Sequence, residues 1–127
     1  MCHALFIAST CELPLVFPTD PLLFSVKALP ERHEAVRAHF PKNWCVRYAG
    51  STSGCSCDFH GENSEPSRLA LHHYLSILPA SFQIMLYDCW EGEMQEPIQE
   101  SVAASIQDLT TNDELIAERR LITFTSH

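Results

Sequence analysis

The stretch His3-Ala-Leu-Phe-Ile-Ala8 decides the fold expected for this chain of 127 residues. After the histidine it holds only apolar residues, so both faces of an extended strand would be apolar. Such a strand is typical of an interior position in a sheet, because an edge or half-exposed strand alternates apolar with polar residues. The sequence therefore predicts a sheet that contains residues 3–8 as a buried strand.

Further strands are expected where the pattern has a period of two. In the segment 81–90, Phe82, Ile84 and Leu86 share one face, and Trp90 continues that face. Similar patterns or compositions predict strands in four other segments, namely 22–29, 43–49, 98–106 and 119–125.

Two segments have helical signals. The segment 30–40 starts with Pro30, which suits a first helical turn, and Pro41 ends it because the residue before a proline avoids helical angles. The segment 64–78 has Ser64 as its expected N-cap and an apolar stripe of Leu71, Leu75 and Leu78. A turn or short helix is expected around 107–115.

The order of these elements does not repeat strand, helix and strand regularly. It predicts a single α+β domain over residues 1–127, with a mixed or antiparallel sheet of five or six strands. We expect the two main helices to cover one face of this sheet.

Composition and charge limit the classes of partner. The chain is 46% hydrophobic with a formal net charge of −8, so it is globular and repels nucleic acid and anionic lipid. No apolar run approaches the length of a membrane span, and the N-terminus lacks a basic region typical of a secretory signal. We expect a cytoplasmic protein that binds neither nucleic acid nor membrane. A protein partner and a homo-oligomer both stay open.

The segment Gly50–Gly61 has the highest density of reactive side chains. Cys55 and Cys57 are two residues apart and His60 follows, which is a ligand pattern for a transition metal, zinc foremost. A closed zinc site needs a fourth ligand, and Cys2 or Cys89 is expected to supply it. Other side chains open to that role are His3, Cys11 and Cys45. The alternative is that the cysteines are small buried residues in a tight turn.

Two other functions stay open beside metal binding. A thiol-dependent enzyme would use Cys55 or Cys57 as nucleophile, with His60 or a histidine of the second helix as base. A metal-free interaction module would use the acidic segment 91–100, with Trp90 and Met94 exposed among the glutamates. We expect His33 and His39 to be exposed helix residues that take no part in a site.

Three motifs resemble a family of short, uncharacterised bacterial proteins. They are Met-Cys-x-Ala-Leu-Phe-Ile-Ala at 1–8, Tyr-x-Gly-Ser-x-x-Gly-Cys-x-Cys-x-Phe at 48–59 and Cys-Trp-x-Gly-Glu at 89–93. The resemblance covers most of the chain and implies no particular activity. It implies that the cysteine motifs at 48–59 and 89–93 serve one common site or function.

Overall fold

The structure is a computed structural model that describes residues 2–19, 23–51 and 56–125. The strands within these ranges are β1 (His3–Ser9), β2 (Ser25–Ala28), β3 (Cys45–Gly50), β4 (Ile84–Trp90), β5 (Glu100–Ala104) and β6 (Arg120–Phe124). The helical segments are η1 (Glu31–His39), η2 (Cys57–Phe59), α1 (Glu65–Ser76) and α2 (Asp108–Thr111). Each strand and each of η1, α1 and α2 lies within or close to the segment where the sequence predicts it, whereas η2 falls in the Cys/His segment, where no helix was expected.

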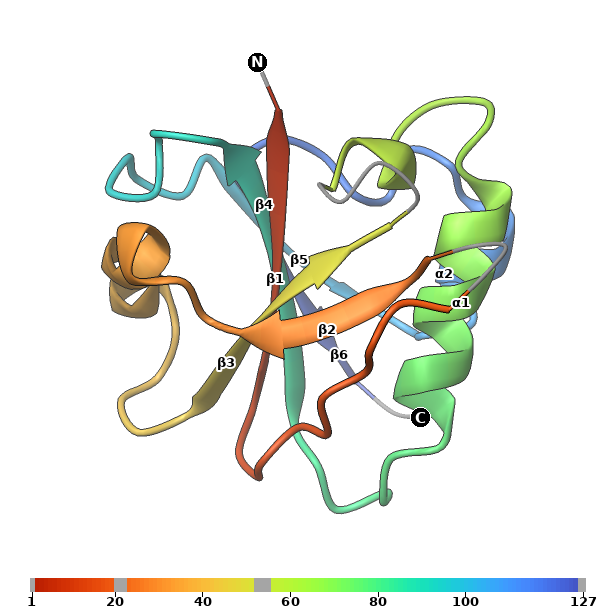
Figure 1. The fold of residues 1–127 in the computed structure, drawn as a ribbon, viewed down its shortest axis with the longest axis horizontal. Coiled ribbons are helices and arrows are strands. Elements are labelled where there is room, and N and C mark those ends of the chain that lie inside the picture. Colours follow the sequence, from red (N-terminus) through yellow and green to blue (C-terminus); the bar gives the residue numbers. More distant parts are fainter. Residues whose placement is uncertain (1, 20–22, 52–55, 126–127) are drawn as a thin grey trace.

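All six strands form one sheet in the order β2-β3-β1-β4-β6-β5 (Figure 1). The pairs are antiparallel except for β5 and β6, which run parallel, so the sheet is mixed. The predicted α+β class, with six strands and two main helices, is confirmed. As expected, β1 is an interior strand, because it pairs with β3 on one side and β4 on the other.

One face of the sheet is covered by α1, α2 and η2. Of the stripe expected from the sequence, Leu71 and Leu75 are fully buried in the core that also holds Leu5 and Ile7 of β1. Leu78, which follows the end of α1, belongs to the same core. Burying a leucine side chain contributes about 1.5–3 kcal/mol, so Leu71 and Leu75 help to hold α1 on the sheet. We call this side of the sheet the α1 face.

The opposite face is covered by η1, which we call the η1 face. Here Val36 of η1 packs with Phe6, Tyr48 and Tyr87 in a second core. The expectation that both main helices cover one face is therefore wrong. The physical reason is that β1 carries apolar side chains on both sides, and each side needs its own cover.

The acidic segment 91–100 does not expose Met94. This residue is 3% exposed and belongs to the second core. The interaction hypothesis therefore loses an interface centred on an exposed Met94. Of the glutamates in the segment, Glu96 and Glu100 are exposed, whereas Glu91 and Glu93 are partly buried. Among the described residues, no helix is long and apolar enough to cross a membrane.

Candidate metal centre

The two imidazoles of His3 and His60 meet on one buried carboxylate. His3 Nδ1 lies 2.9 Å from Asp88 Oδ2, and His60 Nε2 lies 3.1 Å from Asp88 Oδ1. The Asp88 side chain is only 1% exposed, whereas the histidine side chains are 16% and 18% exposed. Because an ionised carboxylate only accepts hydrogen bonds, each ring donates from the nitrogen that faces Asp88.

The pairing of β1 with β4 places His3 and Asp88 on the same face. In the antiparallel register His3 is opposite Trp90 and Leu5 is opposite Asp88, and residues opposite each other share a face. Leu5 lies in the core under α1, so Asp88 also faces α1. The Trp90 indole stacks on the His3 ring with centroids 4.0 Å apart, and this contact restricts the orientation of the imidazole.

His60 reaches the site from the turn after η2. Its ring stacks on His3 with centroids 3.6 Å apart and an interplanar angle of 20°. Gly61 follows with φ at 85°, a left-handed conformation that glycine adopts without the steric penalty of a side chain. The backbone can therefore place His60 above the sheet and reverse direction at Gly61 toward α1.

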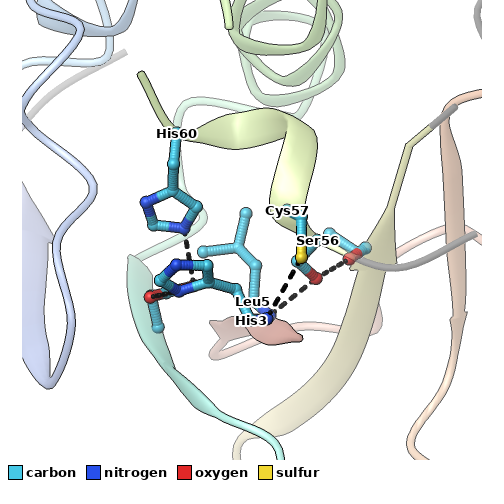
Figure 2. Close-up of polar contacts among 7 residues, drawn as sticks. His3, Leu5, Ser56, Cys57 and His60 are labelled. Atoms are coloured by element: carbon cyan, nitrogen blue, oxygen red, sulfur yellow. Dashed lines mark hydrogen bonds and ion pairs between the residues drawn. The ribbon is translucent and has the colours of Figure 1, made fainter. Parts of the chain in front are cut away.

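Ser56 and Cys57 fasten η2 to the start of β1 (Figure 2). The backbone N–H of Leu5 donates to Ser56 Oγ at 2.8 Å, and this hydroxyl donates to the carbonyl of Ala49 at 2.6 Å. The backbone N–H of His3 donates to Cys57 Sγ at 3.4 Å. These bonds hold the turn that carries His60 against the strand that carries His3.

The site has an approach from solvent beside His60. A cavity of about 460 Å³ is lined by His60, Gly61 and Glu62 together with residues after α2. The cavity leaves room for a small molecule or water next to His60.

Only part of the expected ligand set comes together. His60 lies in the site, and Cys57 lies beside it through its bond to the His3 backbone. Cys55 lies outside the described residues. Cys2 is exposed, and its thiol is not in the group of neighbouring ligand atoms found among the described residues.

Cys89 is on the wrong side of the sheet for the role expected of it. Successive residues of a strand face opposite ways, so Cys89 lies on the η1 face when Asp88 lies on the α1 face. It is fully buried, and burial, with Asp88 as a secondary cause, raises the pKa of the Cys89 thiol to about 12. A neutral thiol behind the sheet is not a ligand for an ion beside His60.

Two members of the cluster had weaker signals in the sequence. His3 was open as a further ligand only because it is a histidine, and Asp88 stands in the Asp-Cys-Trp-x-Gly-Glu segment, which mixes carboxylates and a thiol. What identifies them is the pairing of β1 with β4, which joins positions 85 residues apart. A local pattern cannot show this.

A scan of protein-family models and searches of curated proteins and of solved structures found no match to the chain. The chemistry of the site must therefore follow from its own atoms.

Proposed function

We propose that this protein binds a divalent transition-metal ion, zinc foremost, through His3, His60 and Asp88. The observation that supports this most is the convergence of their ligand atoms, which all lie within 4.8 Å of one another. Among the described residues, this is the group of histidine, cysteine and acidic side chains that lie close enough together to hold an ion.

The donor set suits such an ion. Two imidazoles with one carboxylate occur in open zinc sites and in iron(II) sites with free coordination positions. Two ligand atoms bound to one tetrahedral ion at about 2.0–2.1 Å lie about 3.3–3.4 Å apart. The nitrogen–oxygen distances of 2.9 and 3.1 Å would need to lengthen by a few tenths of an ångström, and the widest spacing in the group, up to 4.8 Å, would need to shorten as the ligands close around the ion.

The ion would take the place of the two protons that Asp88 now shares with the rings. Metal and proton therefore compete for the same nitrogens, and affinity should fall as the solution becomes acidic. The buried Asp88 carboxylate would then be paired with a divalent cation, and this pairing compensates a negative charge that is shielded from water.

Three protein ligands leave a coordination position free. Cys57 is not among the atoms that converge, and the cavity of about 460 Å³ reaches the site at His60. Water or a small ligand could complete the coordination from there. This arrangement favours a sensing or reactive ion over a closed structural one.

Cobalt(II) titration of the tag-free protein tests the proposal, because tetrahedral cobalt absorbs visible light and occupies zinc sites. We expect one equivalent to bind, with affinity reduced by about 100-fold or more in His60→Asn and in Asp88→Asn. The matched control is His73→Asn, which removes an exposed imidazole of α1. Equal binding by His60→Asn and His73→Asn would contradict the site.

A second function, thiol chemistry at Cys57, is favoured by one separate contact. The N–H of His3 donates to Cys57 Sγ at 3.4 Å, and a donor of this kind stabilises the thiolate. Alkylation at about pH 6 should then label Cys57 faster than the exposed Cys2 and Cys11. Slower labelling of Cys57 than of those two would count against a nucleophilic role. Protection of Cys57 by zinc would instead make it a fourth ligand.

A further inference from the structure

A second cavity lies on the η1 face, away from the metal cluster. Its volume is about 490 Å³, and it is formed by the end of η1, the turn after it and the start of β3. The lining residues are Arg37, Ala38, Phe40, Pro41, Lys42, Asn43, Trp44 and Val46. None of these residues belongs to the proposed metal site.

The charge of this cavity is opposite to the charge of the chain. Acidic residues outnumber basic ones by 16 to 8 in the sequence, yet the lining has Arg37 and Lys42 and no acidic residue. Within the described ranges Lys42 makes no ion pair or side-chain hydrogen bond. The Nε of Arg37 donates to Glu34 Oε1 at 2.6 Å, so only one edge of the guanidinium is used. No residue in the described part of the chain bonds its terminal nitrogens, so these can receive an anion.

The floor of the cavity is apolar and already in place. Phe40 is 7% exposed and Val46 3% exposed, both within the second core, and Trp44 packs partly buried against the same core. The turn that carries Lys42 is closed by a hydrogen bond from the Trp44 N–H to the Pro41 carbonyl at 3.3 Å. Asn43 has φ at 72°, a left-handed conformation that asparagine tolerates better than most residues. The cationic rim is therefore held over a fixed aromatic surface.

We propose that this cavity binds a small planar carboxylate that carries an apolar or aromatic body. The free edge of the Arg37 guanidinium matches the two oxygens of a carboxylate, and the ammonium of Lys42 adds a second positive charge. The apolar body lies against Trp44 and the buried floor. A compact, fully charged anion such as phosphate uses the rim but gains nothing from the aromatic surface.

Two probes that differ in charge but hardly in shape test this site, namely benzoate and neutral benzamide. Each is titrated into ¹⁵N-labelled full-length protein at low ionic strength, and the Trp44 indole signal is followed. A Trp44→Phe variant distinguishes this signal from that of Trp90. We expect benzoate to shift the Trp44 indole and the backbone signals of 37–46 saturably, and benzamide to bind at least about ten-fold more weakly.

Variants of Arg37 and Lys42 test whether these two cationic residues bind benzoate. Arg37→Gln should weaken benzoate by about ten-fold and Lys42→Gln by a smaller factor, because each removes a charged donor. Lys27→Gln removes the other lysine of the chain, which is outside the cavity, and should leave binding unchanged. Equal affinity for benzoate and benzamide, shifts scattered over the molecule, or tighter binding of inorganic phosphate than of benzoate would overturn the proposal.

Discussion

His33 is the residue whose surroundings differ most from what its sequence context indicates. It was expected on the exposed side of a helix, but it is fully buried between η1 and the sheet. Its Nε2 lies 2.7 Å from Glu91 Oε1, and its ring packs on Phe6 and Tyr48. The Nδ1 atom has no hydrogen-bond partner among the described residues. The contact with Glu91 is therefore the polar interaction that compensates for burial of this ring.

This contact predicts the effect of removing Glu91. Glu91→Ala leaves both nitrogens of the buried ring without a partner, and we expect the free energy of unfolding to fall by about 1–3 kcal/mol. Urea denaturation of the purified variant measures the loss. Glu96→Ala, an exposed position in the same acidic segment, is the control and should stay near the wild-type value. Similar losses in the two variants would mean that the His33 contact contributes nothing specific.

At the scale of single elements, the serine at the start of α1 makes different hydrogen bonds from those of an N-cap residue. Ser64 occupies the expected N-cap position of α1 but makes no capping bond. Its hydroxyl donates to the Gly61 carbonyl at 2.6 Å and accepts from Arg68 Nε at 2.8 Å. The start of α1 is thereby joined to the turn that follows His60, so helix and site are positioned together.

Ser56 supplies the prediction that belongs to η2. Ser56→Ala removes the hydroxyl that links Leu5 of β1 to Ala49 of β3, and both buried backbone groups lose a partner. We expect a loss of about 1–3 kcal/mol in the free energy of unfolding and weaker cobalt binding, because η2 carries His60.

A second serine variant, Ser76→Ala, is the control for the general effect of removing a serine hydroxyl. Ser76 is exposed and donates one bond to the His73 carbonyl within α1. Ser76→Ala should therefore change neither stability nor cobalt binding by much. If Ser56→Ala matched Ser76→Ala in both measurements, the bridge would not position the site.

At the scale of the whole molecule, three buried side chains that are weak acids make the free energy of unfolding change with pH in the alkaline range. Burial raises the pKa of Cys89 from 9.0 to about 12 and that of Tyr87 from 10.0 to about 12. Burial also raises the pKa of Tyr74, whose hydroxyl donates to the Pro14 carbonyl. In each case the folded protein holds the proton more tightly than the unfolded chain does.

The sign of the effect follows from this difference. Above the unfolded-state values of 9.0 and 10.0 the unfolded chain releases protons that the folded chain keeps, so unfolding becomes more favourable as pH rises. We expect the free energy of unfolding, measured by urea denaturation at each pH, to start falling near pH 9 and to keep falling until about pH 12. Cys89→Ala should reduce the slope, and Cys11→Ala, at an exposed position, should not. A flat profile in the wild type would contradict the prediction.

The positions of the strands and helices were determined by the sequence itself. Their signals are local: the apolar run of β1, the period of two in β4, the leucine stripe of α1 and the prolines that frame η1 all lie within a few residues. Short-range sterics and side-chain periodicity decide these features, so they can be recognised before any tertiary contact is known. The presence of thiols and an imidazole near 55–60 was equally visible.

The membership of the site was decided only by the tertiary structure. His3 and Asp88 are 85 residues apart and His60 and Asp88 are 28 apart, so no local pattern joins them. The antiparallel register of β1 with β4 brings His3 beside Asp88, and the same alternation sends Cys89 to the η1 face. Because a shift of one residue would exchange the two faces, the pairing of the strands selects which side chains meet.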